Sequence, residues 1–257
     1  MSRCRLAIGT LVVCCMFATS VSGQRGGGPA QAPATPKGAA PLDLTGYWVS
    51  VVTEDWRYRM TAAPKGDYAG VPLNPAGRQA ADAWDPARDE TGGEPCKAYG
   101  AAGIMRMPGR LHVTWQGDDT LKIETDAGTQ TRTLSFRDPR GQGGDWQGVS
   151  IASWDPGDSA MTRGGFFPGA APRGGSLKVL TTKMKAGYLR KNGVPYSADA
   201  VMTEYFDRFD VPGGDSWLVV STELVDPTYL ASPFWTSTHF RKQSDASGWN
   251  PRPCAAR

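Results

Sequence analysis

The stretch Arg110–Phe136, RLHVTWQGDDTLKIETDAGTQTRTLSF, decides the fold because apolar and polar residues alternate along it. Such alternation is typical of half-buried strands. Placing the apolar residues on one face of an antiparallel hairpin pairs Trp115 with Leu121. Val113 then pairs with Ile123, and a three-residue Gly-Asp-Asp turn joins the two strands.

The same register places His112 opposite Glu124 on the other face of the hairpin. A third strand continues the pattern. Its apolar residues predict that Ile123 pairs with Leu134, around a two-residue Gly-Thr turn. Thr133 then joins the row formed by His112 and Glu124.

Short segments rich in Val, Ile, Thr, Trp and Tyr recur along the rest of the chain. They are separated by many of the 32 glycines and 20 prolines among the 257 residues, which is typical of strands joined by turns. Nine segments favour a mainly β fold, an antiparallel barrel, with a sandwich as the alternative. The expected strands are 46–53, 110–116, 120–127, 130–137, 148–154, 176–185, 200–208, 216–225 and 234–242.

One short helix is expected inside a long insertion that spans about residues 58–109. Asn74 is a good helix cap, and Pro75 suits the first helical position. Good helix formers follow, so we expect the helix over 75–84.

The N-terminal residues 1–23 have the pattern of an export signal. Arg3 and Arg5 precede the apolar run Leu6–Ala18, and small residues stand before Gln24. The apolar run is shorter than the roughly 20 residues that a membrane-spanning helix needs. We therefore expect cleavage before Gln24 rather than membrane insertion.

The segment 24–41 is rich in Gly, Pro and Ala and contains little that a core would bury. Such a composition predicts a disordered tether. The remaining residues, 42–257, are expected to form one β-barrel domain.

The charge balance indicates no polyanionic partner. The chain has 28 basic and 25 acidic residues, and the expected leader removes two arginines, which leaves a net charge near zero. We therefore expect binding neither to nucleic acid nor to an anionic membrane surface. Oligomeric state does not follow from these features.

The five cysteines indicate an oxidising compartment. Cys4, Cys14 and Cys15 lie in the expected leader, so the mature chain keeps Cys96 and Cys254. An even pair in an exported chain predicts one disulfide and a periplasmic or secreted location.

The row of His112 and Glu124 is a candidate acid-base pair. If the row faces into a barrel, the carboxylate would hold the histidine in one tautomer as a general base. If the apolar row fills the interior instead, the pair faces water and has no chemical role. The alternation does not decide between the two faces.

Two loops are rich in aromatic residues and arginine, with the sequences WRYRM and YLRKNGVPY. At a barrel mouth, rings stack on a ligand and guanidinium groups hold its carboxylate or hydroxyl groups. The alternative is that the rings pack a small core under a loop. The candidate ligand-binding residues are Trp56, Arg57, Tyr58, Arg59, Tyr188, Arg190 and Tyr196.

No metal or cofactor site is expected. The two histidines are far apart in the sequence, and the chain lacks the Cys-x-x-Cys spacing of zinc sites. It also lacks a phosphate-binding P-loop, and its glycine-rich stretches do not join a strand to a helix.

The opening of the first strand, Gly46-Tyr47-Trp48, resembles the Gly-x-Trp motif of lipocalin-like barrels. The resemblance implies that Trp48 closes one end of a barrel and that Arg241, near the last strand, packs over its ring. The whole body, from Asp43 through Asp207, also resembles uncharacterised exported bacterial proteins.

These observations support three hypotheses about function. The first is an exported carrier of a small, partly apolar ligand. The second is a barrel enzyme in which a histidine and a carboxylate move a proton on a small substrate. The third is a carbohydrate or envelope interaction module that uses exposed tryptophans. A deep pocket favours the first, and buried acid-base pairs favour the second.

Overall fold

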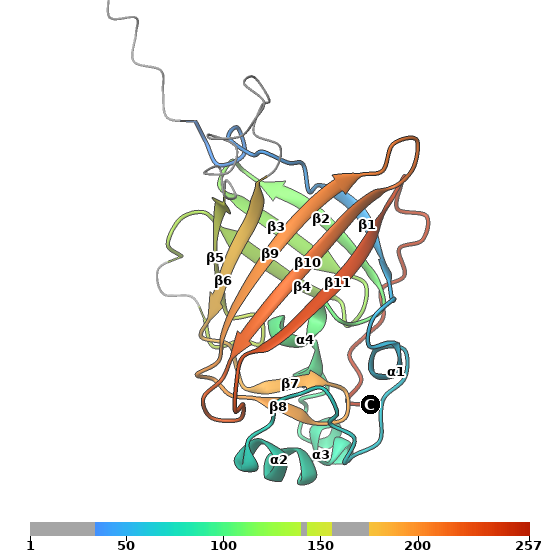
Figure 1. Ribbon diagram of the computed structural model, residues 1–257, viewed down its shortest axis with the longest axis vertical. Helices are drawn as coiled ribbons and strands as arrows, with labels where there is room; N and C mark the ends of the chain where they lie inside the picture. Colours follow the sequence, from blue (N-terminus) through green and yellow to red (C-terminus); the bar gives the residue numbers. More distant parts are fainter. Residues whose placement is uncertain (1–33, 140–142, 156–174) are drawn as a thin grey trace, which may run out of the picture. The chain divides into compact units, whose positions relative to one another are not determined.

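Nine strands close into a barrel in the computed structural model of this protein (Figure 1), which describes residues 34–139, 143–155 and 175–257. The predicted β-barrel is therefore confirmed. The expected leader and the first part of the expected tether, 24–33, lie outside the described residues. The barrel strands are β1 Gly46–Val51, β2 Arg110–Gln116, β3 Thr120–Thr125, β4 Gln130–Ser135, β5 Val149–Asp155, β6 Ser176–Thr182, β9 Val201–Asp210, β10 Ser216–Val225 and β11 Phe234–Gln243.

One pair of neighbouring strands is parallel, for a geometric reason. The ring order is β1-β11-β10-β9-β6-β5-β4-β3-β2, and β2 pairs with β1 to close the ring. An odd number of strands cannot alternate in direction all the way round a ring. The parallel pair is β4 with β5, where Leu134 lies opposite Ser150. The predicted antiparallel pairing holds for the other neighbours in the ring.

The β2–β3 hairpin has the predicted register. Trp115 pairs with Leu121, and His112 pairs with Glu124. Both contacts are local in sequence, so the alternation of side chains and the turn length are sufficient to predict them.

The predicted β3–β4 register is wrong by two residues, because Leu121 and not Ile123 pairs with Leu134. A shift of two keeps every side chain on its face, so the alternation does not distinguish the two registers. The observed turn is longer, and Asp126 holds it in place. Its Oδ1 accepts a hydrogen bond from the backbone N–H of Arg110 at 2.6 Å.

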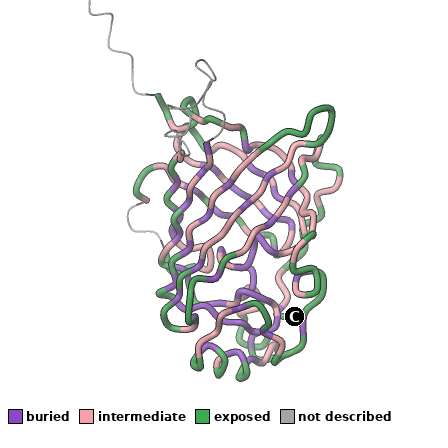
Figure 2. The backbone as a smooth tube through the Cα atoms, viewed as in Figure 1, coloured by how far each residue is buried: buried purple, intermediate pink, exposed green. Residues whose placement is uncertain are grey.

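Apolar side chains fill the barrel, and buried and more exposed residues alternate along its strands (Figure 2). Leu134, Leu177 and Phe206 are each at most 1% exposed. The apolar space that these and neighbouring residues line has no room for a water molecule. Among the described residues, this part of the barrel interior therefore offers a ligand no room.

The insertion between β1 and β2 covers one end of the barrel together with a hairpin of β7 and β8 (Figure 1). The predicted helix is α2, and Asn74 caps it by accepting from the Gly77 N–H at 2.8 Å. The insertion also contains short helices that the sequence pattern did not predict. The elements are α1 Trp56–Arg59, α2 Pro75–Asp82, α3 Pro86–Thr91, the 3₁₀ helix η1 Lys97–Tyr99, α4 Ala101–Ile104, β7 Gly187–Arg190 and β8 Val194–Tyr196.

A second apolar cluster joins this insertion to the barrel. Tyr68 and Ala81 come from the insertion, Leu189 and Tyr196 from the hairpin, and Met202 from the start of β9. Because these side chains are buried together, the hairpin and the short helices are held in fixed positions against the end of the barrel.

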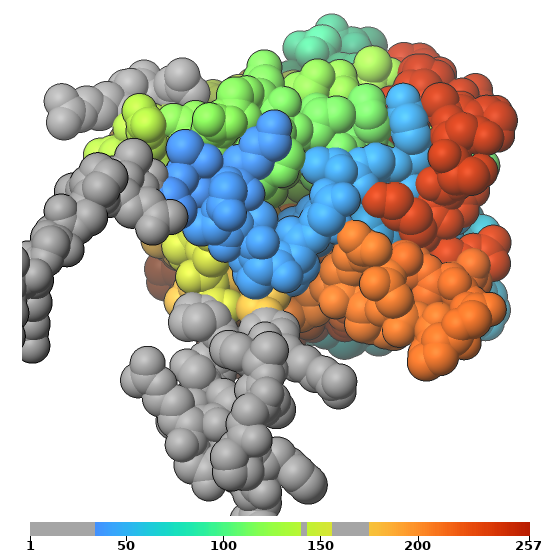
Figure 3. Space-filling model, turned by 90° about the horizontal axis from the view of Figure 1, so that it is seen from above, coloured from blue at the N-terminus to red at the C-terminus, as the bar shows by residue number. Residues whose placement is uncertain are grey.

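The other end of the barrel is covered by the residues that precede β1, drawn in dark blue in Figure 3. The backbone N–H of Lys37 donates to the Asp118 carbonyl at 3.0 Å, and the Trp154 indole donates to the Pro36 carbonyl at 2.7 Å. The described part of the expected tether, 34–41, is thus hydrogen-bonded to the barrel.

Trp48 lies fully buried at this end, where its indole donates to the Leu44 carbonyl at 2.9 Å. The residue over its ring is Lys242, whose Nζ is 4.5 Å from the ring centroid. The expectation that Arg241 packs there is wrong. Arg241 neighbours the buried Phe240 and therefore points to the opposite face, where it lies 3.6 Å from Asp215.

Cys96 and Cys254 form the predicted disulfide, with their Cα atoms 5.0 Å apart. The bond ties the C-terminal residues to the insertion. Further hydrogen bonds hold the same segment, because the Arg252 N–H donates to the Asp126 carbonyl at 2.8 Å and Thr129 donates to the Arg252 carbonyl at 3.1 Å. The C-terminal residues therefore have a fixed position beside the insertion.

Candidate functional site

A pocket of about 500 Å³ lies where the insertion, the β7–β8 hairpin and the C-terminal segment meet. Five parts of the chain contribute to its wall, one of which is the turn between β3 and β4 with Ala127 and Gly128. The other four are the end of α1, the residues around α4, the end of β7 and the residues after Asn250. Its lining residues include Tyr58, Arg59, Met60, Tyr99, Arg106, Met107, Ala127, Gly128, Leu189, Arg190, Lys191, Arg252, Pro253 and Arg257.

Arg59 is held rigidly at the end of α1. Its side chain is 1% exposed, its Nε donates to the Arg106 carbonyl at 2.9 Å, and its Nη1 pairs with Glu54. Its Nη2 is buried without a partner among the described residues. Burial lowers the pKa of Arg59 below its ordinary value, although the Glu54 carboxylate opposes the shift.

Arg106 follows α4 and is also buried, with a side chain 7% exposed. Its Nη2 lies 2.6 Å from a carboxylate oxygen of Asp55, and its guanidinium carbon lies 6.0 Å from the centre of the Phe234 ring. Its Nη1 is buried and, in the described part of the chain, has no hydrogen-bond partner. One edge of the guanidinium group is thus fastened and the other is free.

Arg190 ends β7 and approaches the same pocket from the hairpin. Its Nη1 donates to the Ala69 carbonyl at 2.8 Å, and its guanidinium carbon lies 4.1 Å from the centre of the Tyr58 ring. Burial lowers its pKa, and the positive charge of Arg106 lowers it further. Its Nε also has no partner among the described residues.

The pocket is strongly basic. Its lining contains Arg59, Arg106, Arg190, Lys191, Arg252 and Arg257, and none of the described lining residues is acidic. Glu54 and Asp55 pair with two of the arginines but do not themselves line the pocket. We call this site the arginine pocket.

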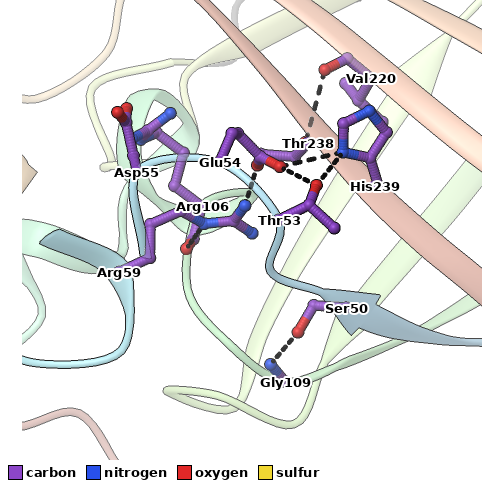
Figure 4. Close-up of polar contacts among 10 residues, drawn as sticks. All are labelled: Ser50, Thr53, Glu54, Asp55, Arg59, Arg106, Gly109, Val220, Thr238 and His239. Atoms are coloured by element: carbon purple, nitrogen blue, oxygen red, sulfur yellow. Dashed lines mark hydrogen bonds and ion pairs between the residues drawn. The ribbon is translucent and has the colours of Figure 1, made fainter. Parts of the chain in front are cut away.

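Glu54 links the arginine pocket to the outside of the barrel (Figure 4). Its carboxylate lies between Arg59 and His239 of β11, with Oε2 2.9 Å from His239 Nδ1, and Thr53 donates to the same oxygen at 2.8 Å. Burial alone would raise the pKa of Glu54, but the Thr53 hydrogen bond and the Arg59 charge lower it overall. The carboxylate is therefore ionised at neutral pH and holds Arg59 in place.

The structure divides the residues that the two loops suggested. Tyr58, Arg59 and Arg190 line the arginine pocket. Trp56 and Arg57 do not line the pocket. Trp56 is 65% exposed to solvent, and Arg57 forms an ion pair with Asp67.

Two further tyrosines from these loops also lie outside the lining of the arginine pocket. Tyr188 has its hydroxyl 3.4 Å from Asp89, and burial raises its pKa to about 12. Tyr196 is completely buried in the second apolar cluster. The surroundings of Tyr188 and Tyr196 fit the alternative hypothesis, in which the rings pack a small core under a loop.

His112 and Glu124 lie on the outer face of the barrel. His112 Nδ1 is 3.1 Å from Glu124 Oε2, and the ring stacks on Tyr47 with 4.2 Å between centroids. Thr133 pairs with Lys122 rather than with Glu124, so it does not extend the row. The pair does not face the barrel interior.

Several residues of the arginine pocket escaped the sequence analysis. Arg106 and Arg252 have neighbours of ordinary composition, and Lys191 lies in the YLRKNGVPY loop but was not among its candidate residues; only the tertiary structure brings the three together. A buried ion pair between Arg132 and Glu204 was missed although a signal existed. Arg132 lies two residues before Leu134 in the same strand, so both side chains point to the inner face.

No family model, curated protein or solved structure matches this chain. Within the described residues, no group of three or more His, Cys, Asp or Glu side chains is placed to hold a metal ion. The helices described above are all too short or too polar to cross a membrane.

Proposed function

We propose that this chain is an exported, lipocalin-like binding protein that holds a small, partly apolar ligand in the arginine pocket. The observation that carries the proposal is the pocket itself. Its volume of about 500 Å³ lies in the range of small-molecule sites, which are concave and mostly apolar with a few polar groups. The apolar space inside the barrel has no room for a water molecule, whereas this pocket lies outside that interior.

The wall of the pocket supports a ligand with an apolar body. Tyr58, Met60, Tyr99, Met107 and Leu189 contribute rings, thioethers and an aliphatic side chain to the lining. Such groups bind by burying apolar surface, and flexible methionines adapt to ligands of different shape. Polar groups in the same wall would then orient the ligand.

The disulfide supports the exported location. A bond between Cys96 and Cys254 persists in an oxidising compartment, as expected for a periplasmic or secreted protein. The export signal expected at residues 1–23 is a second argument for an exported protein.

The first test is native mass spectrometry of protein purified from a periplasmic extract. We expect an added mass of a few hundred daltons that dissociates when the protein is unfolded. A matched pair of variants then locates it. Ala62→Trp places a large ring at an exposed position of the pocket lining, whereas Ala87→Trp makes the same change on the exposed surface of α3.

Loss of the added mass in Ala62→Trp and its retention in Ala87→Trp would support the proposal. Retention in both variants would place the ligand elsewhere. A protein that carries no small molecule and also binds neither of the two dyes described below would refute the proposed function.

A further inference from the structure

The arginine pocket presents more positive charge than its carboxylates balance. Glu54 pairs with Arg59, and Asp55 pairs with Arg106. The buried guanidinium of Arg190 donates to a carbonyl and lies against a ring, and the lining adds Lys191 and Arg252. Buried cations are normally paired with anions, because burial removes the water that would solvate them.

The free hydrogen-bond donors of the pocket belong to the same three arginines. Nη2 of Arg59, Nη1 of Arg106 and Nε of Arg190 are buried without acceptors in the described residues. The remaining edges of these guanidinium groups are fastened by carboxylates and carbonyl oxygens. Because one edge of each of these guanidinium groups is already held, an acceptor that binds these arginines would order few additional groups.

Arg106 lies close enough to the other two arginines to act on both of their guanidinium groups. The charge of Arg106 lowers the pKa of both Arg59 and Arg190, in addition to the effect of burial. An anion placed among them would relieve this repulsion. A neutral ligand would leave the repulsion in place.

The volume of the pocket and the apolar part of its lining favour a ligand larger than a bare inorganic anion. A volume of about 500 Å³ is much larger than such an ion requires. The rings of Tyr58 and Tyr99 and the side chains of Met107 and Leu189 line the same space. The matching ligand carries an acidic group on an aromatic or aliphatic body.

We infer that the arginine pocket binds organic anions, with a carboxylate, sulfonate or phosphate group held among Arg59, Arg106 and Arg190 and an apolar body against the tyrosines and Leu189. The inference rests on the proposed function and adds to it the chemical class of the ligand. Lys191 and Arg252 attract the anion at the rim of the pocket.

The test compares two dyes that differ in one group. 8-Anilinonaphthalene-1-sulfonate is an anion, and N-phenyl-1-naphthylamine has the same ring systems without the sulfonate. Fluorescence titrations use the mature chain with its disulfide intact. We expect one site that binds the sulfonate at least tenfold more tightly than the neutral dye, and this preference should shrink as NaCl is added.

Arg106→Met removes one of the three central guanidinium groups. Its partner Asp55 has a side chain that is 43% exposed, so water can solvate the carboxylate that remains. We expect affinity for the sulfonate dye to fall at least tenfold and affinity for the neutral dye to stay within twofold. Arg137→Met is the control, because Arg137 is exposed and pairs with Asp119 outside the pocket lining.

The outcomes separate the two proposals. If neither dye binds, the proposed function fails and the inference fails with it. If both dyes bind equally well and Arg106→Met changes neither affinity, the anion inference is refuted while the proposed function stands. Should Arg106→Met fail to fold, the rim variant Lys191→Met/Arg252→Met decides, and an unchanged preference for the sulfonate dye refutes the inference.

Discussion

Arg132 and Glu204 form a bidentate ion pair inside the barrel, with Nη2 to Oε2 at 2.6 Å and Nη1 to Oε1 at 3.2 Å. The pair joins β4 to β9, two strands that β5 and β6 separate in the ring. The side chains are 1% and 0% exposed. Thr181 accepts a further hydrogen bond from Arg132 at 3.4 Å, so the pair belongs to a small polar network within an apolar interior.

Breaking this pair should be costly. Glu204→Ala leaves the Arg132 charge buried without its carboxylate, and we expect a loss of about 3–5 kcal/mol in the free energy of unfolding. The double variant Arg132→Met/Glu204→Leu removes both charges and should recover most of the loss. Urea unfolding of the single and double variants measures this coupling. A loss below about 1 kcal/mol in Glu204→Ala would contradict the expectation.

The disulfide should matter for stability and for binding. Removing it in Cys96→Ser/Cys254→Ser should cost up to about 5 kcal/mol in the chain-entropy model, since the bond closes a long loop of 158 residues. The C-terminal segment that it ties down carries Arg252 and Pro253, which line the arginine pocket. We therefore also expect weaker binding of the anionic dye, measured on the folded variant. Equal dye affinity would show that the hydrogen bonds of this segment suffice to position it.

His112→Ala tests the acid-base hypothesis at the outer face. The pair with Glu124 is 27% and 32% exposed, and such pairs contribute less than about 1 kcal/mol. Loss of stacking on Tyr47 should add a comparable amount. We expect a small drop in melting temperature and unchanged affinity for both dyes. A large drop in dye affinity would indicate that His112 has a role in binding.

Gly193 is required by both its backbone and its neighbour. Its φ is +83°, and a Cβ there would lie 2.2 Å from Cγ of Trp84. Gly213 is a matched control, because its φ is +68° but no atom lies within 4 Å of the added Cβ. Gly213→Ala should cost about 1 kcal/mol for the backbone alone, and Gly193→Ala should cost clearly more. Equal costs in urea unfolding would refute the steric part of the argument.

The ion pairs of Glu94 with Lys97 and Lys185 should stabilise the fold at neutral pH and lose this effect at strongly acidic pH. Hydrogen bonds from Lys185 and Lys97 lower its pKa from 4.5 to about 2. Because the folded pKa is below the unfolded value, the contribution is complete above about pH 4.5 and disappears as the pH falls towards 2. The melting temperatures of Glu94→Gln and the unchanged protein should therefore differ at pH 6 and converge near pH 2. A difference that persists at pH 2 would contradict this assignment.

The local features of the fold could be read from the sequence. The β2–β3 register followed from Val113, Trp115, Leu121 and Ile123, because alternation and turn length determine a hairpin. The start of α2 followed from Asn74 and Pro75, because a helix cap also depends on residues close together in the chain. The alternation along β4 also predicts that Arg132 faces inward, because Arg132 lies two residues before the apolar Leu134 and therefore shares its face.

The candidate site could be predicted only in part. The aromatic and arginine-rich loops pointed to Tyr58, Arg59 and Arg190, but the same composition also included Trp56 and Tyr196, which lie elsewhere. Composition shows that a loop contains rings and charges, and it does not show which of them share a cavity.

The sequence by itself determined the nine barrel strands, their alternating faces, the β2–β3 hairpin and the cysteine pair, because each depends on neighbours in the chain or on composition; the strands β7 and β8 were not predicted. Only the tertiary structure decided the β3–β4 register, the filled interior and the arginine pocket. The register depends on Asp126 meeting Arg110, and the pocket depends on Arg59, Arg106 and Arg190 converging from three separate segments. The pocket forms only when distant segments pack together, and a period of two along a strand does not distinguish registers that differ by two residues.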